Sequence, residues 1–426
     1  MKLNLNPIKG TSDYRPKEAR ERELVRQKIL SIYQKNGYQL VKTPVLEHLE
    51  LLSGSEGGDN LRLMFKTVKR GEKLDLSKPN LSLDDLVEEG LRYDLTVPLA
   101  RFYSNNREYL PNPFKSIQID EAFRAERPQR GRSREFVQCD IDVFGDSTVA
   151  AEIELLSTVF EAYAALGFES LTIRVSDKRI LTALMQYAGI APNDFSTVAV
   201  SIDKIADIGV DGVAKELLAK QISPNAVEKL LVAISKIQKC GEAALVEFGV
   251  DKSLVDGLNS VISTSKKIGR LAIEALKLQG KAVDAKNFDI VFDISIVRGQ
   301  GYYTGTVFEA YTQGFARAIG GGGRYDKMVE KLTGQPVSAV GFSMGFEPIT
   351  MLLRENGKLL PARPLVALIY ENEPLEDVLA QKQLLKQKFD VSVFKRPKNM
   401  KAALEKLKQN GFSGYLFFGK NEIVEL

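Results

Sequence analysis

The chain has 426 residues, 44% of them apolar and 27% charged, a length that suits about two to four folded domains. Its 59 basic and 55 acidic residues give a net charge of +4, which permits a nucleic-acid partner without requiring one. Two cysteines, Cys139 and Cys240, do not indicate a disulfide framework, and we find neither a signal-peptide core nor an apolar run near the ~18 residues of a membrane helix. We therefore expect a cytoplasmic protein that does not associate with membranes.

A single histidine, His48, limits the chemistry that the chain can perform. His48 lies in an amphipathic segment and is interpreted as a structural residue. Serine triads, zinc sites with several imidazoles and histidine acid–base catalysis are therefore nearly excluded. Any reaction must rely on carboxylates, arginines, tyrosines and Mg²⁺.

The first part of the chain, up to residue 177, alternates helices and strands. Pro16 suits the first turn of a helix and Gly37 suits its C-terminal cap, with apolar residues at helical spacing between them. The expected elements are helices over 16–36 and 150–166 and strands over 38–44, 117–122, 135–144 and 171–175. A polar connection over 53–85 carries little core material.

The stretch 123–136 reads FRAERPQRGRSREF and holds five arginines but no lysine. It joins two expected strands, so we predict a hairpin-like loop. Arginine offers a planar fork that binds phosphate or carboxylate through two hydrogen bonds at once. On composition alone, a solvated charged loop is the simpler interpretation.

The second part of the chain changes in character twice. Periodic helical segments dominate 178–286 and predict an inserted helical module. The strands and glycine-containing segments that follow cover 288–297, 306–312, 318–332 and 339–353. From about Pro361 the pattern alternates strand, helix, strand, helix, strand, which predicts a small parallel α/β domain.

Five segments carry a resemblance to a known family. They read RYDLTVP (92–98), FRAERPQRGRSREF (123–136), RGQGYYTGTVFE (298–309), GGGGRYD (320–326) and AVGFSMGFEP (339–348). In order and spacing they resemble the histidyl-tRNA synthetases, which are class II aminoacyl-tRNA synthetases, and the arginine stretch is similar to the second class II motif. The likeness covers essentially the whole chain.

The resemblance implies an α+β fold, with a class II antiparallel sheet flanked by helices. It also implies a helical insertion and a C-terminal α/β anticodon-binding domain. The expected boundaries are 1–177 for the first part of the catalytic core, 178–286 for the insertion, 287–357 for the second part of the core and 362–426 for the anticodon-binding domain. A homodimer is expected as well.

The resemblance further implies a two-step reaction that uses L-histidine, ATP, Mg²⁺ and tRNA(His). The histidine carboxylate attacks the α-phosphate of ATP, and the 3′ end of the tRNA then accepts the aminoacyl group. Because the nucleophile is already an anion at neutral pH, the first step needs no general base. The obstacle is the approach of two anions, which fixed cations address. An arginine-rich, histidine-poor site suits this chemistry.

Site residues follow by matched position within the resemblance. Arg124 and Arg298 are expected to be catalytic at the α-phosphate. The residues expected to bind histidine are Asp94, Thr96, Arg124, Gln138, Asp142, Arg298, Tyr302 and Tyr303. The residues expected to bind ATP are Arg124, Glu126, Arg132 and Tyr325, and no metal site made by the protein is expected.

Within this set the roles divide by chemistry. Asp94, Thr96 and Gln138 would hold the substrate ammonium, whereas Asp142 and Tyr303 would bracket the imidazole. A carboxylate on one ring nitrogen and a phenol on the other select one tautomer and reject isosteres that cannot form both bonds. The glycines at 320–323 and Tyr325 would close the pocket, because only backbone fits against the ligand there.

The sequence departs from the family pattern in three places. Pro348 stands where the third class II motif normally ends with an arginine that contacts the γ-phosphate of ATP. RGQGYY contains Gln-Gly where Leu-Asp is common. The C-terminal segment GKNEIVEL is shorter than the family's usual ending, so we expect a trimmed parallel sheet with an exposed edge.

These departures keep other function classes open. A synthetase-like regulatory subunit of ATP phosphoribosyltransferase binds histidine, charges no tRNA and usually lacks the C-terminal domain. The complete arginine stretch and the basic KRPKNMK (395–401) in the C-terminal domain favour the ligase instead. A tRNA-binding protein without catalysis is a third, weaker alternative.

Overall fold

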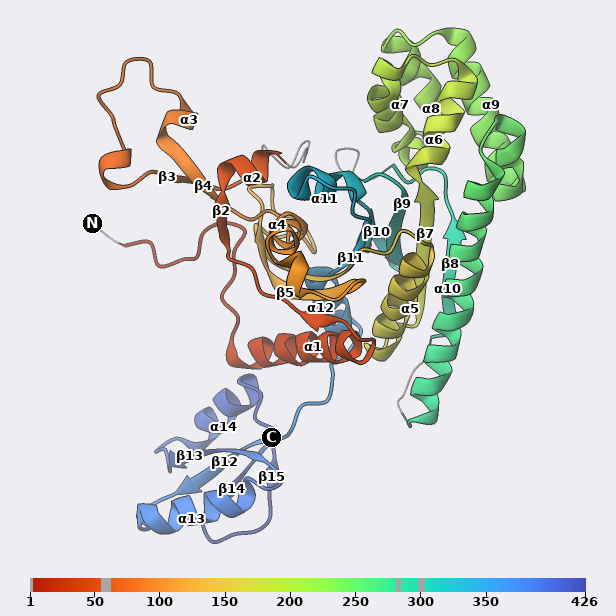
Figure 1. Cartoon of the computed structure of the whole chain (residues 1–426). Helices are drawn as coiled ribbons and strands as arrows, with labels where there is room; N and C mark the ends of the chain where they lie inside the picture. Colours follow the sequence, from red (N-terminus) through yellow and green to blue (C-terminus); the bar gives the residue numbers. More distant parts are fainter. Residues whose placement is uncertain (1–2, 55–62, 281–284, 298–302) are drawn as a thin grey trace. The chain divides into compact units, whose positions relative to one another are not determined.

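The computed structural model describes residues 3–54, 63–280, 285–297 and 303–426 (Figure 1). The chain forms two compact units. One is Lys28–Leu353, and the other combines Met1–Gln27 with Arg354–Leu426. The finer four-part division expected from the sequence stays a prediction. No helix of the described chain combines the length and the apolar character needed to cross a bilayer.

The larger unit is built on a central sheet, which in the described chain has eight strands in the order β1-β5-β6-β11-β10-β9-β7-β8. The strands are β1 (Gln39–Leu40), β5 (Phe114–Phe123), β6 (Glu135–Phe144), β7 (Ser170–Asp177), β8 (Asn287–Phe292), β9 (Thr306–Thr312), β10 (Phe315–Arg324) and β11 (Ala339–Gly345). The pairs from β5 to β7 are antiparallel, and only the outermost pairs, β1–β5 and β7–β8, are parallel. The expected α+β fold with an antiparallel sheet is confirmed.

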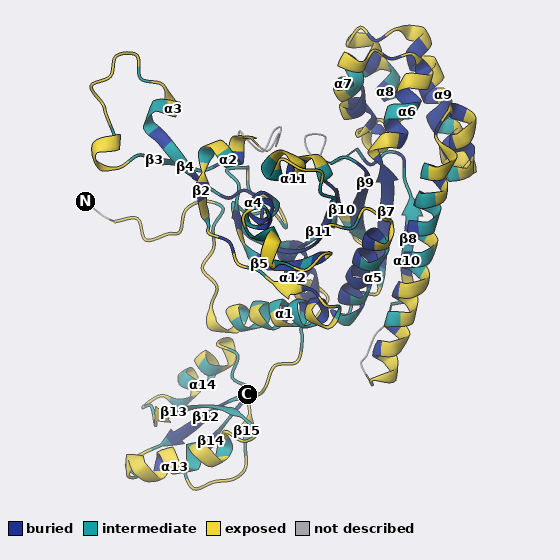
Figure 2. Cartoon of the chain, viewed as in Figure 1, coloured by how far each residue is buried: buried dark blue, intermediate teal, exposed yellow. Residues whose placement is uncertain are grey.

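Strict alternation in β5 and β6 gives the sheet two different faces. Ile117, Ile119, Cys139 and Ile141 are buried on the face covered by helices. There the Tyr33 hydroxyl, from α1 (Pro16–Lys35), donates to the carbonyl of Cys139. Helix α5 (Ala150–Ala165), which was expected, covers the same face and is mostly dark blue in Figure 2. The opposite face of both strands carries polar side chains.

A cluster of aromatic side chains packs beside this polar face. It involves α4 (Thr96–Asn106) and α11 (Asp326–Thr333). The rings of Tyr103 and Phe144 are stacked with their centroids 4.5 Å apart. Tyr325 meets Phe144 edge-on at 6.1 Å and therefore starts α11 from a fixed position.

The described part of the polar connection expected over 53–85 contains regular secondary structure. It contributes β3 (Lys66–Val68) and α3 (Leu83–Leu86). Strand β3 pairs with β4 (Val87–Leu91), which also pairs with β2 (Leu46–His48). A strand of three residues is too short to show an alternating pattern, and α3 depends on a capping box between Ser82 and Asp85.

The segment between β7 and β8 is helical, as its periodicity predicted. Its helices are α6 (Lys178–Ala188), α7 (Phe195–Ile202), α8 (Ile205–Ala219), α9 (Pro224–Cys240) and α10 (Lys252–Leu278). Helix α10 packs on α5 at Gly269, where a Cβ atom would lie 2.4 Å from Cδ1 of Phe160. Glycine is therefore required at this crossing.

The C-terminal residues form a separate sheet with the order β13-β12-β14-β15. Its elements are β12 (Leu365–Tyr370), α13 (Leu375–Leu385), β13 (Asp390–Lys395), α14 (Met400–Gln409), β14 (Gly414–Phe417) and β15 (Val424–Glu425). The strands β13, β12 and β14 are parallel, as expected for alternating strands and helices. The segment GKNEIVEL supplies β15, which pairs antiparallel with β14.

Candidate functional site

A pocket lies on the polar face of the central sheet, against β6, β10 and β11. Its empty volume, which includes open solvent at its mouth, is about 1130 Å³. The predicted site residues that line it are Asp94, Thr96, Arg124, Glu126, Arg132, Gln138, Asp142, Tyr303, Tyr325 and the glycines at 320–323. Arg298 and Tyr302 lie outside the described residues.

The alternation of β6 gives the pocket its polar wall. Gln138, Asp140 and Asp142 all line the pocket. Their directly opposed partners on β5 are, in the same order, Asp120, Gln118 and Ser116. Buried side-chain atoms without a hydrogen-bond partner gather on these strands: Ser116 Oγ, Gln118 Oε1, Gln138 Oε1, Asp140 Oδ1 and Asp142 Oδ2. Because buried polar atoms are normally paired, this concentration marks a place for a polar ligand or ordered water.

Asp142 and Tyr325 form a buried pair at one end of this wall. The Tyr325 hydroxyl donates to Asp142 Oδ1 at 2.6 Å. Burial raises the pKa of Asp142 to about 7, even though the bond from Tyr325 lowers it. Asp142 Oδ2 still has no partner, so the carboxylate can accept an N–H group from a ligand. The resemblance implied that Tyr325 binds ATP. The structure shows in addition that Tyr325 contacts Asp142, the residue expected to bind the imidazole.

Asp94 lies two residues before Thr96, which is the first residue of α4. Asp94 Oδ1 accepts a hydrogen bond from the backbone N–H of Val97 at 3.1 Å. Burial raises the pKa of the Asp94 carboxyl, while backbone hydrogen bonds and the nearby Arg124 lower it. A buried carboxylate beside a threonine hydroxyl suits a ligand ammonium group.

Gln138 is anchored across two strands. Its Nε2 donates to Ser343 Oγ at 3.1 Å. Ser343 stands directly opposite Asp140 in the pairing of β6 with β11. Burial and the neighbouring Asp142 hold the pKa of Asp140 well above its usual value, whereas a hydrogen bond from the Ser343 side chain lowers it. The sequence singled out neither Asp140 nor Ser343.

Arg124 is fixed at the start of the arginine stretch. Its Nε donates to the carbonyl of Tyr93 at 2.9 Å, and its guanidinium lies over the ring of Phe136 with 5.1 Å between Cζ and the centroid. The Arg124 backbone N–H also donates to the carbonyl of Arg134 at 2.8 Å. These contacts hold the guanidinium at the pocket wall.

The rest of the arginine stretch forms the predicted hairpin. Gln129 and Arg132 exchange two backbone hydrogen bonds, of 3.0 and 2.9 Å, around Gly131, whose φ of +73° requires a glycine. Arg132 Nη1 lies 3.3 Å from Glu126 Oε2. The Arg132 side chain is 51% exposed, so it remains accessible to a ligand from solution.

Apart from Ser343, the strands β10 and β11 contribute mainly space to the pocket. A Cβ atom on Gly341 would lie 1.9 Å from Asp142 Oδ1, and one on Gly323 would lie 3.0 Å from Cδ1 of Tyr303. Both separations are below normal van der Waals contact. The need for glycine therefore extends from the predicted run at 320–323 to Gly341.

Pro348 lines the opposite end of the pocket, in α12 (Phe346–Glu355). Its Cβ lies 3.5 Å from the position that a Cβ of Gly131 would occupy, so the ring faces the arginine hairpin. Next to it, Glu347 Oε1 accepts a hydrogen bond from the backbone N–H of Val137 at 3.2 Å. The pocket therefore has a neutral side chain at the position where the third class II motif normally has an arginine.

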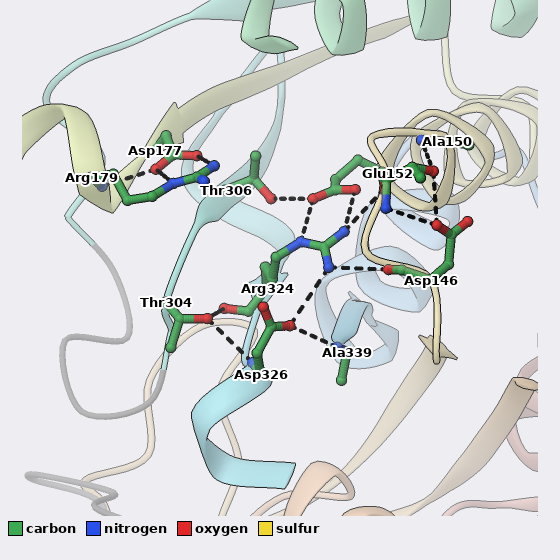
Figure 3. Close-up of polar contacts among 11 residues, drawn as sticks. Asp146, Ala150, Glu152, Asp177, Arg179, Thr304, Thr306, Arg324, Asp326 and Ala339 are labelled. Atoms are coloured by element: carbon green, nitrogen blue, oxygen red, sulfur yellow. Dashed lines mark hydrogen bonds and ion pairs between the residues drawn. The ribbon is translucent and has the colours of Figure 1, made fainter. Parts of the chain in front are cut away.

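A buried ion pair supports the pocket from the end of β10 (Figure 3). Arg324 Nε and Nη2 donate to the two carboxylate oxygens of Glu152, at 2.7 and 2.6 Å. The hydroxyl of Thr306 donates to Glu152 as well, at 2.9 Å. The backbone N–H of Thr304 donates to the Arg324 carbonyl at 2.7 Å. These bonds hold the residues that follow Tyr303 and precede Tyr325.

Comparison with known proteins identifies the family. A family model described as histidyl-tRNA synthetase matches residues 10–349, which include every described residue of the pocket. A histidine–tRNA ligase of Leifsonia xyli is 38% identical over 424 residues, covering 97% of this chain and 95% of that protein. The chain belongs to the histidyl-tRNA synthetase family. A histidine–tRNA ligase of Gloeobacter violaceus is 33% identical over 373 residues, 83% of this chain and 76% of that protein.

Two solved structures have a similar fold. A crystal structure of histidyl-tRNA synthetase from Nostoc sp. PCC 7120 has a TM-score of 0.75 at 23% identity, over 97% of this chain and 91% of that one. A structure described as an ATP phosphoribosyltransferase regulatory subunit/histidyl-tRNA synthetase, from Bacillus halodurans C, has a TM-score of 0.73 at 17% identity, over 98% and 99%. Both show the class II synthetase fold.

Proposed function

We propose that the chain is a histidine–tRNA ligase, which activates L-histidine with ATP to histidyl-adenylate and then transfers the histidyl group to tRNA(His). One observation carries this proposal. A single pocket combines buried carboxylates, suited to the ammonium and imidazole of histidine, with a guanidinium at its arginine-rich wall, suited to carboxylate and phosphate. The predicted residues come from segments far apart in the sequence.

The arginine end would allow the first step. The histidine carboxylate attacks the α-phosphorus, a new P–O bond forms, the bond to the bridging oxygen breaks, and pyrophosphate leaves with the electron pair. Negative charge accumulates on the phosphate oxygens in this step. Arg124, held by Tyr93 and Phe136, is a pre-oriented cation that needs no rearrangement when that charge develops. Arg298 is proposed to act beside it.

The acidic end would select histidine. Asp142 Oδ2 accepts a hydrogen bond from the N–H of one imidazole nitrogen. Tyr303, which lines the same pocket, is proposed to bond to the other ring nitrogen. Asp94, Thr96 and Gln138 are proposed to hold the ammonium. An amino acid without a ring N–H would leave the buried Asp142 oxygen unpaired, a penalty of about 1–3 kcal/mol.

Mg²⁺ would accompany ATP rather than occupy a cage made by the protein. The described residues contain no group of three or more His, Cys, Asp or Glu side chains that could hold a metal. Mg²⁺ is usually held by substrate phosphates with one or two carboxylates, and Glu126 and Glu347 line the pocket. The ion would neutralise phosphate charge. The homodimer and the cytoplasmic location belong to the same proposal, and analytical ultracentrifugation tests the first.

Histidine-dependent ATP–pyrophosphate exchange tests the function. We expect exchange that requires L-histidine and Mg²⁺ATP, followed by charging of tRNA(His) transcript. Binding of histidine without exchange would instead favour the regulatory subunit of ATP phosphoribosyltransferase. Arg298→Ala should lower the exchange turnover far more than the affinity for histidine, and the opposite pattern would reject its assignment to the phosphate.

A further inference from the structure

Asp140 and Ser343 together determine which way the amide of Gln138 points. The three residues form a short chain across two strands, since Ser343 faces Asp140 in the register of β6 with β11. Ser343 Oγ lies 3.1 Å from Gln138 Nε2. All three line the pocket.

The hydroxyl of Ser343 has one proton to donate and oxygen lone pairs that accept. The hydrogen bond between Ser343 and Asp140 lowers the pKa of that carboxyl against the effect of burial, which means that Ser343 donates its proton to the ionised form of Asp140. Ser343 Oγ must then accept from its other neighbour. Gln138 can satisfy it only by presenting Nε2, which is the orientation found here.

This orientation decides what Gln138 offers to a ligand. With Nε2 used by Ser343, the oxygen Oε1 is the remaining end of the amide, and it is buried without a partner. An ammonium group would satisfy that oxygen with a charge-assisted hydrogen bond. A flipped amide would set N–H donors against the ammonium and place two acceptors at Ser343.

We propose that Ser343, oriented by Asp140, is a positioning residue that directs Oε1 of Gln138 at the ammonium group of the substrate histidine. This inference rests on the proposed function and adds two residues to it. Neither side chain needs to touch the imidazole or ATP. The effect of losing Ser343 should therefore depend on whether the ligand carries an ammonium.

The test compares two ligands on the wild-type full-length chain and on four variants of it. L-Histidine has the ammonium, and 3-(imidazol-4-yl)propionate keeps the ring and the carboxylate but lacks it. Both are measured as competitors or substrates in ATP–pyrophosphate exchange. Ser343→Ala removes the hydroxyl, Ser343→Thr retains it, and Asp140→Asn replaces the carboxyl group with an amide that cannot ionise and that carries its own N–H donors. Ser265→Ala, at a buried serine in α10, serves as the matched control.

We expect Ser343→Ala to weaken the binding of histidine about five- to tenfold, as for the loss of one hydrogen bond between neutral groups, with the KM for ATP and the propionate inhibition constant unchanged. Ser343→Thr should restore the affinity for histidine, and Asp140→Asn should weaken it in the same ligand-selective way. Ser265→Ala should change nothing. Equal weakening of both ligands by Ser343→Ala would overturn the inference while leaving the ligase activity in place. If the wild-type chain shows no histidine-dependent exchange, the proposed function is rejected, and this inference is rejected with it.

Discussion

Two halves of the same sheet face build the pocket in opposite ways. The strands β5 and β6 fill it with polar side chains, which face one another in three pairs: Ser116 with Asp142, Gln118 with Asp140, and Asp120 with Gln138. The strands β10 and β11 meet this wall with glycines. Gly341 stands opposite Asp142, and Gly345 stands opposite Gln138. The first half supplies most of the polar groups, and the second supplies the space for a ligand together with the hydroxyl of Ser343.

The two halves also differ in how they are held. The polar half is held by strand pairing over ten consecutive residue pairs and by the buried cluster of Tyr103, Phe114 and Phe144. The glycine half buries Ile319, Val340, Phe342 and Met344 in the core, but its run of glycines at 320–323 adds no packing, and glycine weakens a strand. Arg324 and Glu152 anchor the end of β10 that follows this run. An open pocket next to a sheet requires such an anchor.

The largest effect is expected when this anchor is broken. Arg324→Met leaves Glu152 charged and buried without its partner; the two side chains are only 9% and 3% exposed. We expect the free energy of unfolding to fall by about 3–5 kcal/mol. Chemical denaturation followed by circular dichroism measures the change.

Two further variants isolate the ion pair in that experiment. Arg324→Met combined with Glu152→Met replaces both charges by apolar groups and should recover most of the lost stability. Glu247→Gln breaks the surface pair with Lys236 and should leave the unfolding midpoint unchanged. If Arg324→Met were as mild as Glu247→Gln, the glycine half would be held by something other than this pair.

The second prediction is that adding a methyl group to the glycine half affects histidine binding as much as removing a carboxylate from the polar half. Gly341→Ala would place a Cβ 1.9 Å from Asp142 Oδ1 and displace that carboxylate. We expect it to raise the KM for histidine about tenfold to a hundredfold, as Asp142→Asn should, since each removes a charge-assisted hydrogen bond. Steady-state exchange kinetics measure both.

The matched control is Gly257→Ala in α10, where the added Cβ would make only an ordinary contact of 3.7 Å with Val149. Helix propensity makes that change neutral or slightly stabilising. Normal histidine affinity in Gly341→Ala would contradict the claim that the glycine half determines the position of Asp142.

The third prediction concerns the pH dependence of Asp142. Tyr325→Phe removes the hydrogen bond that lowers the pKa of this carboxyl, so the pKa should rise further above about 7. Because the imidazole N–H needs an ionised acceptor, the pH at which histidine binding is half-maximal should move upward. Affinity should recover at high pH. Free histidine titrates identically with the wild type and with the variant. The difference between their pH profiles is therefore due to a protein group.

Stability gives an independent readout of the same group. Asp142 has its usual pKa of 3.8 in the unfolded chain and a pKa of about 7 in the folded chain. Between these two pH values the folded chain holds a proton on Asp142 that the unfolded chain has lost. The free energy of unfolding therefore falls as the pH rises through this window. Asp142→Asn should flatten that part of the profile, leaving the contributions of the neighbouring Asp94 and Asp140, whose pKa values are also raised. An identical profile would mean that Asp142 is ionised well below neutral pH.

Local patterns predicted much of this molecule and failed where distant strands must be aligned. The hairpin around Gly131, helix α5 and the C-terminal alternation follow from spacing and turn chemistry. The partnership of Gln138 with Ser343 joins residues 205 positions apart and exists only because β11 pairs with β6 in one register. The bond from Tyr325 to Asp142 likewise requires the fold. A polar residue in a strand can be recognised as a site residue only when its neighbours across the strands are known.

The smallest effect is expected at Pro348, which lies between the glycine strand β11 and the arginine hairpin. It is buried in the wall of the pocket and contributes no charge. Pro348→Arg should lower the KM for ATP several-fold, because a new cation there can contact phosphate, a contact worth at most about 1.5–3 kcal/mol. Pro348→Gln, which adds length without charge, is the matched control and should not lower it. An unchanged or higher KM in Pro348→Arg would mean that another group already serves the phosphate, or that Gly131 and Gly345 leave no room for the longer side chain.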